Sequence, residues 1–409
     1  MEKKFKKKLT IGLLFYELRL GGAVKHLFYL AQYLQRQGHQ VVIFSASITK
    51  DCFPELTKNL DIRVLPKKIN QPPLLPKTKL KIYWTIISYN WRKFISFVQM
   101  IIREPIDIYN AYDYPADLVA AGAKLITHKP VVYTLNDIWH IPGFQLRKDK
   151  RRYYRFVQKT FFWWLERLAV KILIDQVIVL SQWAKEVVKR AYGCSSQILA
   201  PGLEGHIYQK LPNPEIAREK NKLANVFTFL YLGILLPHRR LEDFIWAFEK
   251  LSQEFSGKPM QLIIAGSPQA SQLYSQKIKQ LAKKAKGKII LKFKEFSEKQ
   301  VFDLLVSTDV FVFPAEYQTW GMTVIEAMAC GKPCIVADKV GAAQMISHGK
   351  TGLIFGEKQK QDLYEQMKKL FSNKNLCLDI GREARRAVIK KVSWEKYAKE
   401  TEKIYKSLL

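Results

Sequence analysis

The stretch FVFPAEYQTWGMTVIEAMACGKPCIVAD, Phe311–Asp338, carries strand, loop, helix and strand signals one after another. Residues 310–313 and 334–337 are short apolar runs with β-branched and aromatic side chains, which predicts strands buried on both faces of a parallel sheet. Between them, residues 323–330 are strong helix formers, and the Gly-Lys-Pro that follows is a typical helix stop. The stretch therefore predicts one βαβ unit in an α/β protein.

The loop before this helix, residues 317–322, follows the carboxyl end of a strand, where open α/β sheets bind their ligands. Gly321 lets the backbone approach a ligand closely. The N–H groups at the helix start face an anion or a sugar hydroxyl under the positive end of the helix dipole. Glu326 on the helix can accept both hydroxyls of a ribose, although an isolated helical glutamate is more often a solvated or capping residue. The loop is therefore a candidate ligand site.

The string QTWGMTVIEAMACGKPCIVAD, with GAAQMISHGKTGLIF after it, resembles the donor-binding segment of the retaining glycosyltransferases of family four. That family has the GT-B fold, in which two Rossmann-like domains face each other across a cleft. Its Glu-x7-Glu pair brackets an aromatic-Gly-hydrophobic turn, and its second glutamate binds the nucleotide ribose. The resemblance makes Glu326 the ribose ligand, and Gln318 stands where the first glutamate is usual. It assigns the sugar site to Gln318, Trp320, Gly321, Met322 and Thr323.

The second domain is expected to open with a strand ending at Gly233 and a helix from residue 241. The family has two cations here that clamp the donor pyrophosphate. Ile234 replaces the first, and Arg239 stands at the second, where its planar fork can grip a phosphate with two parallel N–H bonds. Alone, the His-Arg-Arg run fits a solvated helix start; the resemblance implies that Gly233, His238 and Arg239 bind the donor.

The chain begins with a βαβ pattern. Residues 9–16 predict a strand rather than a signal peptide, because no small-residue cleavage site follows the short apolar run. Gly21 and Gly22 then open an amphipathic helix that ends at Gly38. In the family this Gly-Gly turn faces the donor phosphates, so the resemblance makes both glycines donor-binding candidates, although Gly-Gly pairs are common in tight turns.

Further strands are predicted over residues 106–110, 130–135 and 176–180. Where the family usually has Thr-x-His-Asp, this chain has Thr-Leu-Asn-Asp ending at Asp137. Asn136 replaces the histidine near the sugar, and its amide can donate and accept hydrogen bonds but cannot carry a proton at neutral pH. Such enzymes are thought to need no obligatory protein base. The resemblance therefore implies a catalytic group of Asn136, Arg239, Gln318 and Glu326.

Length and composition predict the domain organisation. A chain of 409 residues exceeds one typical core, and residues 198–215 are rich in Pro and Gly, as a linker is. We expect a Rossmann-like acceptor domain over residues 1–200 and a Rossmann-like donor domain over residues 201–385. The resemblance implies that a last helix, within residues 386–409, crosses back to the first domain.

The formal net charge of +31 favours an anionic partner, although a lysine-rich surface of the thermophile kind is the alternative. Residues 79–104 and 146–171 mix cations with aromatic side chains, the composition of an interfacial helix on anionic lipid. Ordinary domain helices with aromatic core residues are the competing interpretation. Neither segment has the uninterrupted apolar run of about 18 residues that predicts a membrane span.

Together these features predict a retaining glycosyltransferase that moves a hexosyl unit from a nucleotide-diphosphate sugar to a glycan or lipid-linked acceptor. We expect no cofactor and no metal ion. We expect a cytoplasmic protein, because five scattered cysteines suggest free thiols, with peripheral contact to the anionic membrane face. Asn136, Ile234 and Gln318 depart from the family pattern and leave open a catalytically weak nucleotide-sugar-binding homologue or partner subunit. A basic nucleic-acid-binding protein is a second alternative, but no specific nucleic-acid motif is recognisable.

Overall fold

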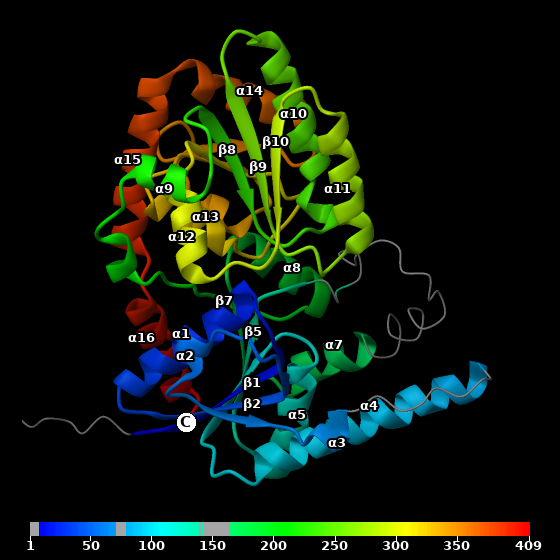
Figure 1. Cartoon of the computed structure of the whole chain (residues 1–409). Coiled ribbons are helices and arrows are strands. Elements are labelled where there is room, and N and C mark those ends of the chain that lie inside the picture. Colours follow the sequence, from blue (N-terminus) through cyan, green and yellow to red (C-terminus); the bar gives the residue numbers. More distant parts are fainter. Residues whose placement is uncertain (1–7, 71–78, 139–140, 142–162) are drawn as a thin grey trace, which may run out of the picture.

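The computed structural model describes residues 8–70, 79–138, 141 and 163–409. These residues form two α/β domains, one above the other in Figure 1, each built around one parallel sheet. The strand orders are β3-β2-β1-β4-β5-β6-β7 and β10-β9-β8-β11-β12-β13. The order reverses between β1 and β4 in the first sheet and between β8 and β11 in the second. Such a reversal is where open α/β sheets bind ligands, at the carboxyl ends of the strands.

The first domain alternates strands and helices, and its predicted strands are confirmed to within one or two residues. Of the predicted basic aromatic segment, residues 146–162 lie outside the described residues, and the remainder forms α7. The elements are β1 (Thr10–Leu18), α1 (Gly22–Arg36), β2 (Gln40–Ile48), α2 (Pro54–Thr57), β3 (Asp61–Val64), α3 (Lys67–Asn70), α4 (Lys79–Ile102), β4 (Ile108–Tyr112), α5 (Ala116–Thr127), β5 (Val131–Leu135), α7 (Trp163–Ile172), β6 (Gln176–Val179), α8 (Gln182–Tyr192) and β7 (Gln197–Ile198).

The second domain contains the predicted βαβ unit as β11, α13 and β12, and its predicted helix begins at residue 241. Its elements, with the helices that follow, are η2 (Gly205–Tyr208), α9 (Pro214–Lys220), β8 (Phe227–Leu232), η3 (Pro237–Arg239), α10 (Leu241–Glu254), β9 (Met260–Gly266), α11 (Gln272–Lys284), β10 (Lys288–Phe293), α12 (Glu298–Val306), β11 (Val310–Phe313), α13 (Met322–Ala329), β12 (Cys334–Ala337), η4 (Gly341–Met345), β13 (Leu353–Phe355), α14 (Lys360–Ser372), α15 (Lys374–Lys391) and α16 (Trp394–Ser407).

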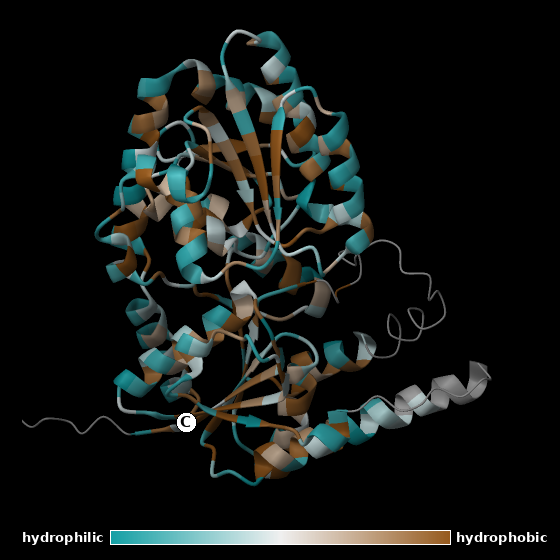
Figure 2. Cartoon of the chain, viewed as in Figure 1, coloured by the Kyte–Doolittle hydropathy of each residue, from teal (hydrophilic) through white to brown (hydrophobic). Residues whose placement is uncertain are grey.

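Central strands of both sheets are buried along their whole length, among them β5, β9, β11 and β12. Their apolar side chains cannot alternate with polar ones because helices cover both faces of a parallel sheet. Figure 2 shows brown, apolar residues along the strands and a mixture of brown and teal on the surrounding helices. The second domain therefore has one main core cluster, and the first domain has one on each face of its sheet.

Helix α16 packs on the first domain although it follows the second domain in the chain (Figure 1). The Trp394 indole stacks on the Tyr29 ring of α1 at a centroid distance of 5.1 Å, and both side chains are buried. The Asn110 amide donates a 2.6 Å hydrogen bond to the Tyr405 hydroxyl. A Cβ atom on Gly202 would lie 2.1 Å from the Trp394 nitrogen, so this chain crossing requires glycine. Helix α16 thus completes the core of the first domain.

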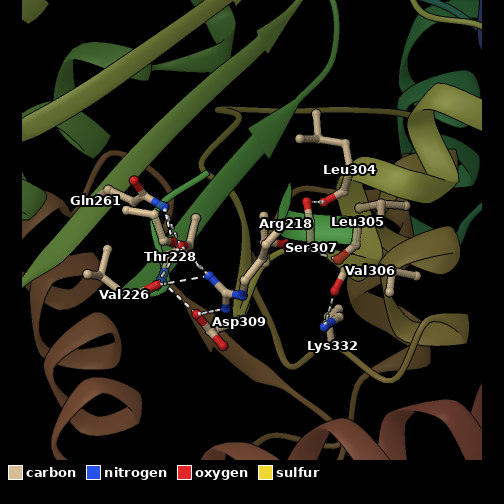
Figure 3. Close-up of polar contacts among 12 residues, drawn as sticks. Arg218, Val226, Thr228, Gln261, Leu304, Leu305, Val306, Ser307, Asp309 and Lys332 are labelled. Carbon is tan, nitrogen blue, oxygen red and sulfur yellow. Dashed lines mark hydrogen bonds and ion pairs between the residues drawn. The ribbon is translucent and has the colours of Figure 1, made fainter. Parts of the chain in front are cut away.

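A network of polar side chains joins the amino ends of strands in the second sheet (Figure 3). The guanidinium of Arg218 donates to Asp309 at 2.8 Å and to the Thr228 hydroxyl at 3.1 Å. Gln261 also donates to Thr228, at 2.9 Å, and the Thr228 N–H donates to Asp309 at 2.7 Å. These residues join α9 to the amino ends of β8, β9 and β11. They stabilise the amino ends of these strands, whereas ligands of such sheets bind at the carboxyl ends.

Candidate functional site

A cavity of about 920 Å³ lies between the domains, where both strand-order reversals meet. All of the predicted site residues except His238 and Glu326 contribute to its wall. Those that line the cavity are Gly21, Gly22, Asn136, Gly233, Arg239, Gln318, Trp320, Gly321, Met322 and Thr323.

Two helix N-termini face each other across this cavity. Helix α1 starts after Gly21 and α13 after Gly321, and neither start is capped by a side chain. A Cβ atom on Gly22 would lie 3.7 Å from the Met322 side chain, so the two ends are close neighbours. The positive end of each helix dipole therefore points toward one space, where it favours an anion.

The turn before α13 is fixed by the segment after β12. The Gln318 N–H donates to the Lys339 carbonyl at 3.1 Å, and the Gly341 N–H donates to the Gln318 carbonyl at 2.8 Å. A Cβ atom on Gly341 would lie 2.0 Å from the Thr319 carbonyl oxygen, so no larger residue fits there. Gly321 has a φ of 106°, a conformation that favours glycine. The turn is thus held rigidly at the cavity wall.

Arg239 brings an unpaired cation to the cavity. Its side chain is 8% exposed, and its Nε and Nη1 atoms have no hydrogen-bond partner among the described residues. The guanidinium lies 5.2 Å from the centre of the Phe313 ring, which supports its charge. Burying an unpaired charge is costly, so this arrangement provides for an anion that enters the cavity.

His238 supplies no charge to this site. Burial and the neighbouring Arg239 lower the pKa of His238 to about 2, so the ring stays neutral. The ring stacks on Tyr317 with a centroid distance of 4.8 Å and an interplanar angle of 8°. The carbonyl oxygen of His238 accepts a 2.7 Å hydrogen bond from the Glu316 N–H. These contacts tie the short η3 helix, and with it Arg239, to the loop after β11.

Asn136 lies at the carboxyl end of β5 within a buried polar group. Its amide oxygen lies 2.8 Å from Nδ1 of His26, and its backbone N–H donates to Asp113 at 2.7 Å. Burial lowers the pKa of His26 to about 4, so His26 is neutral near pH 7. The Asn136 amide nitrogen has no partner among the described residues. It is therefore available to donate a hydrogen bond to a ligand.

Asp113 was missed by the sequence analysis although it lines the cavity. It follows β4 directly, at the reversal of the first sheet, and has a left-handed φ of 58°. Its carboxylate accepts from the N–H groups of Asn136 and Asp137, at 2.7 and 2.9 Å. An aspartate at the end of a strand beside the reversal is a signal that could have found it.

Glu326 lies behind the turn rather than on the cavity wall, and it is 4% exposed. Lys25 of α1 donates to its carboxylate at 2.7 Å and lies 2.7 Å from Glu298 of α12. Burial opposes the charge of Lys25, but the two carboxylates outweigh it and raise its pKa. Sequence reasoning did not find Lys25, because only the packing of the two domains brings it to Glu326.

The described residues contain no group of three or more His, Cys, Asp or Glu side chains placed to hold a metal ion. Within the same part of the chain, no helix combines the length and the apolar character needed to cross a bilayer. Helix α4, the longest helix among the described residues, carries four cations along its sequence.

Two family models match the chain. "Glycosyltransferase Family 4" matches residues 20–202 and "Glycosyl transferases group 1" matches residues 213–387. A probable sucrose-phosphate synthase of Thermosipho melanesiensis is 23% identical over 400 residues, which cover 93% of this chain and 89% of that protein. The capsular polysaccharide biosynthesis glycosyltransferase CapM of Staphylococcus aureus is 24% identical over 325 residues, 77% of this chain and 81% of CapM.

Solved structures match over both domains. The structure of Anabaena HepE in complex with UDP and glucose has a TM-score of 0.77 and 17% identity, and the match covers 98% of this chain and 100% of HepE. A sucrose-phosphate synthase from Thermosynechococcus elongatus has a TM-score of 0.77 and 16% identity, with 98% and 99% of the two chains covered. With the family models and the two facing parallel sheets, these likenesses show that the chain belongs to the group 1, family 4 glycosyltransferases and has the GT-B fold.

Proposed function

We propose that this glycosyltransferase is a retaining hexosyltransferase that takes its sugar from a nucleotide-diphosphate donor and transfers it to a glycan or lipid-linked acceptor. The observation that carries the proposal is the buried, unpaired guanidinium of Arg239 on a cavity that also receives two uncapped helix N-termini. A pyrophosphate offers the negative charge that all three groups favour. HepE, which shares the fold, is known in complex with UDP-glucose.

The donor nucleotide would lie against the second domain. In this proposal Arg239 and the start of α13 hold the pyrophosphate, and Gln318 with the N–H groups of the turn orients the sugar. Glu326, which lies behind the turn and does not line the cavity, is the proposed ligand of the ribose hydroxyls, and Lys25 fixes the orientation of its carboxylate through their 2.7 Å contact. Ile234 replaces a cation of the family pattern, so the start of α1 at Gly22 supplies part of the missing positive charge.

The reaction replaces one bond at the anomeric carbon with another. The bond from this carbon to the phosphate oxygen breaks, and a bond to the acceptor hydroxyl oxygen forms on the same face, which retains the configuration. The proton of the acceptor hydroxyl passes to an oxygen of the departing β-phosphate. Arg239 and the helix termini stabilise the charge on that leaving group, which is usually the largest contribution in such chemistry. Asn136 needs only to donate a hydrogen bond.

We also propose that the protein works in the cytoplasm, in peripheral contact with anionic lipid. All five cysteines are free thiols, which suits a reducing compartment. Trp91 on α4, Trp164 on α7 and Ile172 at the end of α7 are each at least 60% exposed. Exposed aromatic side chains beside cations are the surface that an interfacial protein presents to lipid.

Calorimetric titration with a panel of UDP, GDP and ADP sugars tests the donor site. We expect one donor to bind and Arg239→Met to weaken it about 10- to 100-fold, because a charge-assisted hydrogen bond contributes about 1.5–3 kcal/mol. Arg240→Met is the matched control, since Arg240 pairs with Asp243 at 2.7 Å. Unchanged affinity in Arg239→Met would remove its role. Absence of binding across the whole panel would instead favour a partner subunit.

A further inference from the structure

The cavity extends beyond the donor residues into the first domain, between α4, α5 and α7. We call this part the apolar arm. It is lined by Trp91 and Phe94 of α4, Leu118 and Leu125 of α5, Leu165 of α7, and Leu173 directly after α7. The same cavity contains Asn136 and Asp113, so the arm opens directly onto the predicted sugar site. No part of a nucleotide sugar has the apolar surface that this arm would match.

Small residues on α5 create the space in the arm. Gly122 lines the cavity, and a Cβ atom there would lie 3.1 Å from the Phe94 ring. The glycine therefore lets α4 approach α5 closely, and α7 also packs against α5. A channel lined by such side chains offers few partners to water, and filling it with hydrocarbon is favourable.

The surface around the arm is unusually apolar. Among the described residues, seven of the fourteen exposed large hydrophobic side chains belong to these three helices: Trp91, Ile95, Leu125, Ile126, Trp164, Leu168 and Ile172. Exposed apolar surface gathered in one region marks an interaction site. Arg92 of α4 and Arg167 and Lys171 of α7 are exposed on the same helices. The charge there suits a ligand with an anionic or strongly polar head.

We propose that the apolar arm binds the hydrocarbon chain of an amphiphilic acceptor. The chain lies between α4, α5 and α7, and the hydroxyl that receives the sugar lies near Asn136 and Asp113. This inference rests on the proposed transferase function and narrows it, because a free polar glycan would leave the arm empty. In this proposal the exposed apolar side chains around the arm contact the hydrocarbon chain as the acceptor leaves a lipid surface.

The test uses methyl and n-octyl β-D-glucoside as acceptor probes, below the micelle concentration of the octyl compound, with nucleoside diphosphate present. Calorimetry should show that the octyl glucoside binds at least tenfold more tightly, because seven further methylene groups leave water. Leu125→Glu places a charge in the arm and should remove this preference. Leu273→Glu is the matched control, since Leu273 of α11 is 77% exposed in the other domain.

Trp91→Glu, at a side chain that is 61% exposed on α4, repeats the test from another wall and covers the case in which Leu125→Glu fails to fold. Equal affinity for the two glucosides overturns the inference, and so does an octyl preference that survives in both variants. Binding of nucleotide sugars separates the two proposals. Donor binding without an octyl preference refutes only the arm, whereas an octyl preference without any donor binding refutes only the transferase.

Discussion

The residues around Arg239 show how burial decides which groups carry charge. Arg239 remains charged because a guanidinium cannot be deprotonated in proteins, whereas its neighbour His238 has its pKa lowered to about 2 by burial and by that same cation. His26, buried below Asn136, has its pKa lowered to about 4 by burial alone. Apart from the exposed Arg19, the fixed positive charge of the site therefore comes from the buried guanidinium of Arg239 and from two helix ends. The imidazoles act as neutral spacers.

These two histidines predict a loss of stability in acid. Both have native pKa values below the ordinary 6.5, so the unfolded chain binds more protons and stability falls as the pH drops below 6.5. Between pH 6.5 and pH 5 each histidine should cost about 2 kcal/mol of unfolding free energy. Urea unfolding of His238→Phe, which keeps a ring on Tyr317, should show about half of this combined acid dependence. A pH dependence equal to that of the wild type would contradict the assignment.

At the scale of elements, the two ends of the strands in the second sheet differ. The carboxyl ends present groups for binding, and the amino ends are joined by stabilising contacts. At the carboxyl edge, the turn before α13 and the η3 helix present unpaired donors to the cavity. At the amino ends of the strands, Arg218, Thr228 and Asp309 hydrogen-bond to one another, and the Gln261 amide donates to Thr228. Hydrogen-bonded polar groups stabilise a fold, whereas buried donors left unpaired on a cavity wall are candidates for ligand binding. Substitutions at the two edges should therefore have different consequences.

Asp309→Ala tests this division. Removing the carboxylate leaves the Arg218 guanidinium without its charged partner, and because the Asp309 side chain is 31% exposed, the loss should be about 1.5–3 kcal/mol, the range for a hydrogen bond to a charged group. Thermal unfolding should show a lowered Tm, while the donor affinity at 20 °C stays within a factor of two or so of the wild type. Asp379→Ala removes a carboxylate that is 63% exposed and should change the Tm little. A large loss of donor affinity in Asp309→Ala would argue against separate edges.

The elements themselves could be predicted because local patterns specify them. The unit from β11 to β12 was found at its observed ends, since apolar runs and a Gly-Lys-Pro stop mark them in the sequence. The departures at Asn136, Ile234 and Gln318 were also visible. Two features of the site were not, the Lys25 contact with Glu326 and the apolar arm. Both depend on how separate elements pack, α1 against α13 and α4 against α5 and α7, which no local pattern encodes.

At the scale of the whole molecule, polar contacts between the two domains hold them together. The Thr319 hydroxyl of the second domain donates to the Asn136 carbonyl of the first. Tyr29 of α1 donates to Glu298 of α12 at 3.2 Å, beside the contact of Lys25 with Glu298 and Glu326. The chain also connects the domains, because α16 follows α15 of the second domain and completes the core of the first. The residues predicted to bind the donor thus lie on both sides of this contact between the domains, which we call the joint.

Lys25 is the residue at which this joint can be tested. Its side chain is 16% exposed and neutralises two carboxylates, so Lys25→Met should lower the unfolding free energy by about 3 kcal/mol and weaken donor binding by freeing Glu326. Lys277→Met, which removes the surface pair with Glu242 at a 52% exposed lysine, should cost about 0.5 kcal/mol and leave the donor affinity unchanged.

A double-mutant cycle isolates the contact across the domains. If Lys25 acts through Glu326, the losses in Lys25→Met and Glu326→Gln should not add, and the coupling energy in urea unfolding should be about 1–3 kcal/mol. The same cycle measured on donor binding should couple as well, because ribose binding in this proposal needs Glu326 oriented by Lys25. Additive losses in both measurements would show that the ion pair neither joins the domains nor orients the carboxylate. Coupling in stability alone would show that Lys25 joins the domains but does not orient Glu326 for ribose binding.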